Sequence, residues 1–92
     1  MKPRSRKPGD KNVIGAKVLA YRQANDIKQK DFLAQLQVMG MDISSTSLSR
    51  LEWQERLVQD REIVIIAVVM KIDPNELLDW KNAVREVLYG NG

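Results

Sequence analysis

The 92-residue chain is predicted to be an all-α protein with one small domain and one core. Its apolar residues recur at helical spacing, as at Ile14, Val18 and Tyr21, which fall at i, i+4 and i+7. The segment from Ile63 to Met70 is rich in β-branched residues, but no second strand-like segment exists for it to pair with. We therefore expect five short helices and no sheet.

Start and stop signals place the five helices at about residues 12–25, 28–39, 45–53, 60–71 and 74–88. Asn12 can cap the first helix, and Gly40 tolerates the left-handed backbone that ends the second. The hydroxyl of Ser44 can accept from the free N–H groups at the start of the third. Asp73 and Pro74 combine a capping carboxylate with proline at the first helical position, which is a strong start signal for the fifth.

Composition excludes several classes of function. With no Cys and no His, the chain lacks disulfides, thiol nucleophiles and the usual histidine ligands and bases. No clustered carboxylate pair, phosphate-binding glycine loop or metal-ligand spacing is present, so we expect no enzyme activity, cofactor, metal or small-molecule substrate. The longest apolar run has eight residues, too short for a membrane span, and the N-terminus lacks the apolar region of a signal peptide. We expect a cytoplasmic protein.

Positive charge is concentrated in the first third of the chain. Residues 1–30 contain nine Lys or Arg against two Asp, a net charge of +7, whereas residues 31–60 and 61–92 sum to −3 and −1. Clustered basic side chains favour a polyanion such as nucleic acid, because binding releases the counterions of its phosphates. Residues 1–11 are expected to form a flexible basic arm, for which a solvated tail without a partner is the alternative.

The second and third expected helices form a pair joined by a glycine-containing turn. Apolar residues give each helix an inward face: Phe32, Leu33, Leu36, Leu48 and Leu51. The outward positions of the third helix are polar: Ser45, Thr46, Ser49 and Arg50. The inward apolar side chains are needed to form a core, whereas the outward polar side chains are needed only to bind a partner. This arrangement is typical of a helix-turn-helix that reads DNA.

Residues over roughly 13–78 share the pattern of a known family. In chain order they are Ile14, Gly15, Val18, Arg22, Ile27, Gln29, Ile43, Ser44, Leu48 to Glu52, Ile63, Ile66, Ala67, Met70, Ile72, Leu77 and Leu78. Together they resemble the lambda repressor/Cro-like helix-turn-helix regulators of the xenobiotic-response-element type. The resemblance implies a compact five-helix DNA-binding domain over residues 12–79 and a prokaryotic or phage origin. Residues 80–92 lie beyond the resemblance and are expected to form a C-terminal helical extension.

The resemblance also implies roles for individual residues. The helix at about 45–53 is expected to meet base edges in the major groove through Ser45, Thr46, Ser49 and Arg50. Contacts to phosphates are expected from Lys28, Gln29 and Arg56. Arg22 and Glu52 match positions that form an ion pair between the first and third helices. The alternatives are a capping and solubility segment at residues 44–47, an ordinary surface glutamine, and two solvated charges.

Three residues and one turn depart from the family pattern. Lys28 stands at the usual capping Ser or Thr, Leu33 at a small alanine, and Gln54 at the glycine that usually ends the third helix. The turn from Leu36 to Ser44 is longer than the three or four residues of a compact motif. These differences bear on the angle of the third helix.

A second apolar surface is expected, made of residues that have no partner inside a minimal domain of this type. Its members are Ile65, Val68 and Val69 on the fourth helix, followed by Trp80, Val84, Val87 and Leu88. The extension could fold back onto the fourth helix or pair with its copy. We expect a homodimer, because repressors of this type read two half-sites about 34–36 Å apart across a two-fold axis.

The sequence therefore predicts a sequence-specific regulator of transcription that binds double-stranded DNA. We expect a repressor, although the same residues are equally compatible with activation. The alternative is a protein-interaction module, such as an antitoxin or an anti-repressor partner, that uses the same fold and binds another protein through residues 80–88. The apolar C-terminal stripe favours this alternative, which does not require the hydroxyl-rich third helix.

Overall fold

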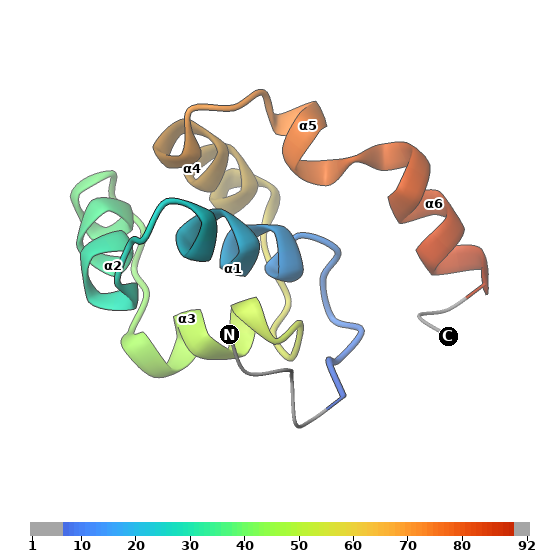
Figure 1. Ribbon diagram of the computed structural model, residues 1–92, viewed down its shortest axis with the longest axis horizontal. Helices are drawn as coiled ribbons and strands as arrows, with labels where there is room; N and C mark the ends of the chain where they lie inside the picture. The colour runs from blue at the N-terminus through green and yellow to red at the C-terminus, as the bar shows by residue number, and fades with distance from the viewer. Residues whose placement is uncertain (1–6, 90–92) are drawn as a thin grey trace.

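The computed structural model describes residues 7–89, which form six α-helices and no strands (Figure 1). The helices are α1 (Gly15–Ala24), α2 (Gln29–Val38), α3 (Ser45–Glu52), α4 (Asp60–Met70), α5 (Pro74–Leu78) and α6 (Trp80–Tyr89). The predicted all-α class is confirmed. Within residues 7–89 no helix is long and apolar enough to cross a membrane.

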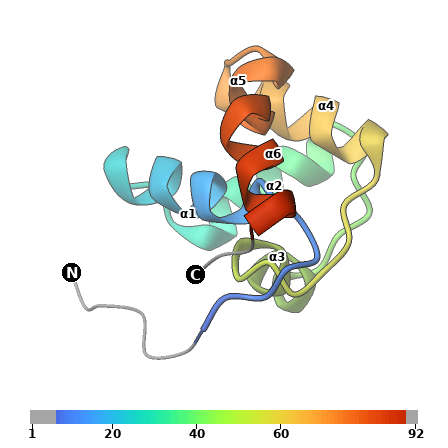
Figure 2. The same cartoon turned by 90° about the vertical axis from the view of Figure 1, so that its right-hand side faces the viewer.

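In Figure 1, α1 lies at the centre of the view, with the other helices placed around it, and Figure 2 shows α1 reaching one side of the molecule. α3 packs on α1 and α2, α2 packs on α4, and α5 packs on both α4 and α6. In Figure 1, α2 lies at the left end, α6 at the right end and α3 along the lower edge. The molecule measures 36 × 29 × 21 Å along its principal axes, so α2 and α6 lie at opposite ends of its longest dimension.

The core draws its side chains from α1 to α5. The most deeply enclosed are Ile14, Val18, Phe32, Leu36, Leu48, Leu51, Ile66 and Leu77. Most inward positions predicted from helical spacing are therefore buried, although Leu33 is only half-buried. The long α2–α3 turn contributes as well, because Met41 and Ile43 are buried in the same cluster. The additional residues of this turn thus serve the core.

Predicted start and stop signals lie where the helices begin and end. The Ser44 hydroxyl accepts from the Ser47 N–H at 3.1 Å, and the Asp73 carboxylate accepts from the Asn75 N–H at 2.7 Å. Gly40 has a φ of +94° just after α2, which is the left-handed conformation that its position predicted. These local signals were sufficient to place three helix ends.

One expectation about α4 is wrong, because Ile65 and Val69 do have partners within the chain. They are 8% and 9% exposed and belong to the core cluster, whereas Val68 is 51% exposed. α4 is apolar around most of its circumference and packs on both α2 and α5, so neighbouring helices cover more than one of its faces. Of these three residues, Val68 alone remains exposed.

The expected single helix from Pro74 to about Leu88 is interrupted at Asp79. Asp79 adopts φ 46° and ψ 59°, a left-handed conformation that ends α5 and turns the chain into α6. Its side chain accepts from Asn82 Nδ2 at 2.6 Å and pairs with Lys17 Nζ at 3.1 Å. No residue of α6 is buried, so its apolar residues are not folded into the core.

The described part of the expected N-terminal arm is bonded to the end of α3. The Gly9 N–H donates to the Trp53 carbonyl at 2.8 Å, and the Lys11 N–H donates to the Gln54 carbonyl at 2.9 Å. α1 begins only at Gly15, and the Asn12 side chain accepts from that N–H at 2.8 Å. Residues 9–12 therefore form a strap along the end of α3, while residues 1–6 of the expected arm lie outside the described residues.

Candidate nucleic-acid interface

α3 has one apolar face and one polar face. Leu48 and Leu51 are completely buried, which turns the opposite side of the helix away from the body. Ser45, Thr46 and Arg50 are exposed on that side, and Ser49 is half-buried. All four residues predicted to meet bases lie on this one short helix, with Ser49 the least accessible of them.

Arg50 carries a positive charge at the end of the polar face. Its guanidinium Nη2 donates to the Glu55 carbonyl at 3.4 Å, a long bond to a neutral acceptor. This bond does not compensate the charge of Arg50. A guanidinium can donate two parallel hydrogen bonds, so an exposed arginine here can address either a guanine edge or a phosphate.

The start of α2 lies beside the end of α3. Lys28 is exposed in the N-cap position and offers no side-chain acceptor to the helix. Gln29 follows it and donates from Nε2 to Glu52 Oε1 at 3.1 Å. Two residues predicted to contact phosphates are therefore next to each other at a helix N-terminus, where unpaired backbone N–H groups and the helix dipole favour an anion.

An ion pair between Arg22 and Glu52 joins α1 to α3. Arg22 Nε donates to Glu52 Oε2 at 2.6 Å, and Nη2 donates to Oε1 at 3.0 Å, a bidentate arrangement. The side chains are 13% and 3% exposed, and Arg22 also donates to the Ile27 carbonyl at 3.0 Å. Because Gln29 shares the same carboxylate, this network fixes the start of α2 relative to the end of α3.

Arg56 is engaged elsewhere. Its guanidinium forms a bidentate pair with Glu62, with N–O distances of 3.1 and 2.9 Å, and also donates to the Leu57 carbonyl. The pKa of Glu62 lies below its usual value, chiefly because Arg56 hydrogen-bonds its carboxylate. Glu62 Oε1 also accepts from the Gln59 N–H at 2.9 Å, so Arg56 supports the start of α4. Its charge is therefore already balanced by Glu62.

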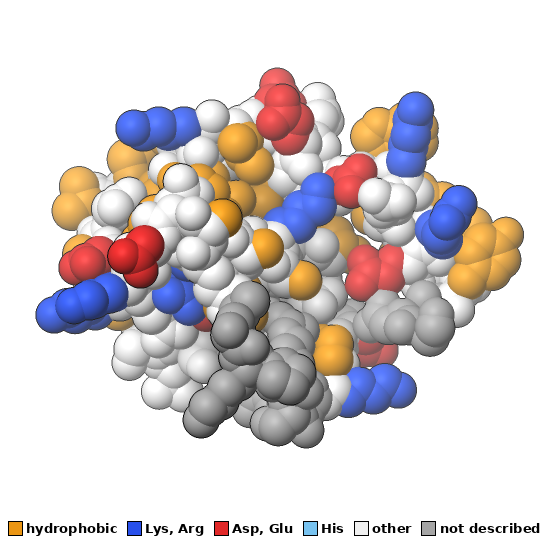
Figure 3. All heavy atoms as spheres, in the orientation of Figure 1, with side chains coloured by type: hydrophobic (Ala, Val, Ile, Leu, Met, Phe, Trp, Pro, Cys, Tyr) orange, Lys and Arg blue, Asp and Glu red, His pale blue; other side chains and the backbone are white. Residues whose placement is uncertain are grey.

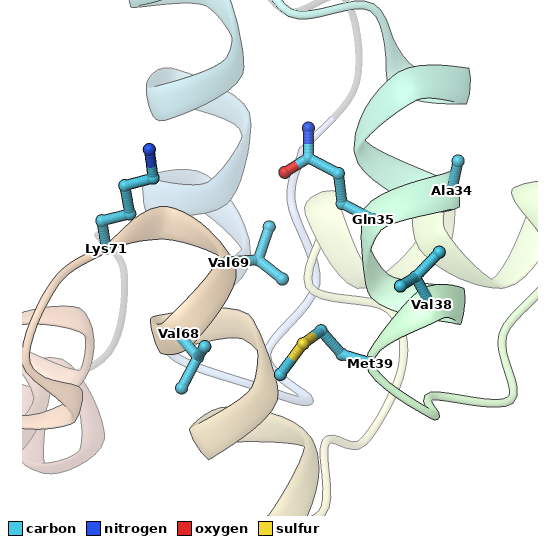
Figure 4. Close-up of a pocket in the computed structure, with 7 residues that line it drawn as sticks. All are labelled: Ala34, Gln35, Val38, Met39, Val68, Val69 and Lys71. Atoms are coloured by element: carbon cyan, nitrogen blue, oxygen red, sulfur yellow. The ribbon is translucent and has the colours of Figure 1, made fainter.

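The expected second apolar surface is divided between two ends of the molecule. A groove of about 390 Å³ lies between α2 and α4. Figure 4 shows the residues that line it: Ala34, Gln35, Val38, Met39, Val68, Val69 and Lys71. A second groove of about 370 Å³ lies along α6, lined by Val13, Leu78, Trp80, Ala83, Val84, Val87 and Leu88. Figure 3 shows hydrophobic side chains gathered at these two ends. Ile65 lines neither groove, and Val68 and Val69 are separated from the α6 residues.

Sequence reasoning did not anticipate the contacts at the end of α3. Gln54 is buried, and its Nε2 donates to the Asn12 carbonyl at 2.8 Å. Asn12 Nδ2 in turn donates to the Leu51 carbonyl at 3.1 Å and to the Arg56 carbonyl at 2.9 Å. The one available signal was the glutamine standing at a family glycine position. It indicated a difference at this place without identifying the partner.

Within residues 7–89 no three His, Cys, Asp or Glu side chains are grouped so as to hold a metal ion. Comparison of the chain with protein families, with curated proteins and with solved structures finds no match.

Proposed function

We propose that this protein is a sequence-specific, double-stranded DNA-binding regulator of the lambda repressor/Cro-like helix-turn-helix type, and acts as a repressor. The observation that carries the proposal is the polarity of α3. Its leucines are buried while three polar side chains are exposed, with the N-terminus of α2 held beside its end. The major groove of DNA admits an α-helix, and its base edges are read by hydrogen-bonding side chains.

Within this proposal α3 contacts the bases and the start of α2 contacts the phosphate backbone of the DNA. Arg50 discriminates best, because its guanidinium can bind O6 and N7 of guanine together, whereas Ser45 and Thr46 can donate or accept. The Lys28 ammonium and the second N–H of the Gln29 amide contact phosphate, aided by the α2 dipole. Arg56 is a weaker candidate for phosphate contact because Glu62 neutralises it.

A homodimer completes the proposal. Proteins of this type bind two half-sites about 34–36 Å apart, one helical turn of DNA. The longest dimension of the chain is 36 Å, so two copies joined through α6 across a two-fold axis would place points midway along each chain at a similar separation. α6 lies at one end with Trp80, Val84, Val87 and Leu88 exposed, and burying them on a second copy would remove apolar surface from water.

The deciding experiment is selection of a preferred sequence from random duplex DNA, followed by titration at two salt concentrations. Arg50→Ala is expected to weaken the preferred sequence about 10- to 100-fold, as loss of one bidentate base contact does, and to change non-specific binding much less. Arg61→Ala is the matched control, because it removes an exposed arginine from α4, which has no part in the proposed interface. Failure to enrich any sequence contradicts the proposal.

The α6 stripe supports a second candidate function, that of a protein-interaction module such as an antitoxin or an anti-repressor partner. This stripe consists of Trp80, Val84, Val87 and Leu88, which are large apolar side chains exposed at one end of the molecule. A binding partner retained through α6, combined with no sequence preference in the DNA selection, would favour this function. Loss of that partner on Val87→Asp would locate the contact on α6.

A further inference from the structure

Three segments meet at Gln54, just beyond the end of α3. Gln54 is 4% exposed, and its Nε2 donates to the Asn12 carbonyl of the strap at 2.8 Å. The same nitrogen lies 3.5 Å from Glu86 Oε1 on α6, at the outer limit of a hydrogen bond but toward an acidic side chain. Gln54 is therefore a polar connection between α3, the strap and α6.

The backbone at Gln54 has a conformation that favours glycine. Its φ of +60° is a left-handed conformation, which glycine adopts at lower cost than glutamine. The strap also approaches closely here, because a Cβ at Gly9 would lie 2.3 Å from the Gln54 carbonyl oxygen. A glycine at position 54 would relieve the strain and would lose both side-chain bonds. The glutamine therefore keeps its side-chain contacts with the strap and with α6 in spite of a strained backbone.

Two polar contacts connect α6 and the residue before it to the body. At its start, Asp79 pairs with Lys17 of α1 at 3.1 Å. Further along, Glu86 lies next to Gln54. Figure 2 shows α6 running from α5 toward the α3 side of the molecule. These two contacts connect α6 and its start to α1 and to the end of α3, and hydrogen bonds and ion pairs are directional whereas apolar contacts are not.

We propose that Gln54 is a positioning residue that fixes the spacing between the two half-sites read by a dimer. This rests on the proposed function, with α6 as the dimer contact. In such a dimer the separation of the two α3 helices depends on the angle between α6 and α3 within each chain. One inserted base pair moves a half-site by about 3.4 Å and turns it by about 35°, so a rigid connection rejects it. A loosened connection tolerates it.

The test compares Gln54→Gly with Lys71→Gly. Lys71 has a φ of +61° at the end of α4 and is exposed, so its replacement relieves the same backbone strain without removing a buried side chain. Affinity is measured for the selected operator and for the same operator with one base pair added or removed at its centre. Wild type and Lys71→Gly should lose about tenfold or more on altered spacing, and Gln54→Gly less than about threefold.

A second variant and a DNA-free measurement complete the design. Glu86→Ala removes only the α6 side of the connection and should relax spacing in the same way. Amide hydrogen exchange should become faster in residues 9–12 and 80–89 of Gln54→Gly, and stay unchanged there in Lys71→Gly.

Wild-type spacing selectivity in both Gln54→Gly and Glu86→Ala would overturn the positioning role, as would unchanged exchange in α6. These results differ from failure of the proposed function, in which wild type selects no DNA sequence. In that case the proposed role in half-site spacing is also refuted. Amide hydrogen exchange then still shows whether Gln54 holds α6 in place.

Discussion

Replacing Glu52 with alanine is the most direct test of how α3 is held in place. Glu52 is 3% exposed and accepts two hydrogen bonds from Arg22 and one from Gln29. Its removal leaves the Arg22 guanidinium, 13% exposed, with the neutral Ile27 carbonyl as its remaining acceptor in this network. A nearly buried charge that loses its counter-ion is costly, because neither protein nor water then solvates it fully.

The expected loss lies at the lower end of the range for broken buried pairs. Such losses are about 3–5 kcal/mol, and the residual exposure of Arg22 together with its bond to Ile27 favours about 3 kcal/mol. For a domain of this size each kcal/mol lowers the melting temperature by about 4–8 °C, so Glu52→Ala should melt about 12–24 °C below wild type. The total stability of small domains is only about 5–15 kcal/mol, so a large fraction is at stake.

The assay is thermal unfolding followed by circular dichroism, with two controls. Glu76→Ala removes an exposed glutamate and should change stability by no more than about 0.5 kcal/mol. The double variant Arg22→Met with Glu52→Leu removes both charges and should recover most of the loss. A Glu52→Ala protein that melts with wild type would refute the reasoning, since the pair would then contribute no more than a solvated one.

Three further substitutions test other contacts. Gly15→Ala should destabilise the fold by about 1–3 kcal/mol in urea titration, although helix propensity alone favours alanine, because the new Cβ would lie 2.1 Å from the Leu51 carbonyl oxygen. Ser44→Ala should cost about 1 kcal/mol in the same titration through loss of the α3 cap. Because Arg56 lowers the pKa of Glu62, the stabilisation from Glu62 is present above its usual pKa of 4.5 and is lost as the pH falls through the lower folded value. Glu62→Gln should therefore weaken the fold at pH 7 by about 1–2 kcal/mol and flatten its acid dependence, measured as unfolding free energy against pH. Equal pH profiles for the two proteins would contradict this.

Features determined by a few adjacent residues were predictable from the sequence. The caps at Ser44 and Asp73 and the stop at Gly40 depend on side chains and backbone preferences within one turn of each helix. The inward positions of α3 followed from helical spacing, because burial of Leu48 and Leu51 fixes which side faces out. The sequence alone therefore predicts which side of α3 is polar.

Features that depend on distant partners were not predictable in this way. The break at Asp79 is accompanied by an ion pair with Lys17, which is 62 positions away in the chain and reaches the junction from α1. Burial of Ile65 and Val69 depends on how α2 and α5 enclose α4, and periodicity gives no such information for a helix that is apolar on most sides. The ion pair of Arg56 with Glu62 was not predicted, because a basic residue in a loop gives no sign of its partner.

α3 is too short to be stable by itself, and this explains the polar contacts at its end. It has eight residues, whereas isolated helices below about 12–15 residues are marginal in water, so tertiary contacts must hold it. Burial of two leucines fixes which face is turned inward but allows sliding and tilting, because apolar contact is non-directional. The Arg22–Glu52 pair and the Gln54 bonds are directional and sit at the same end of the helix. Loss of either should therefore alter the angle of α3 while its leucines remain buried.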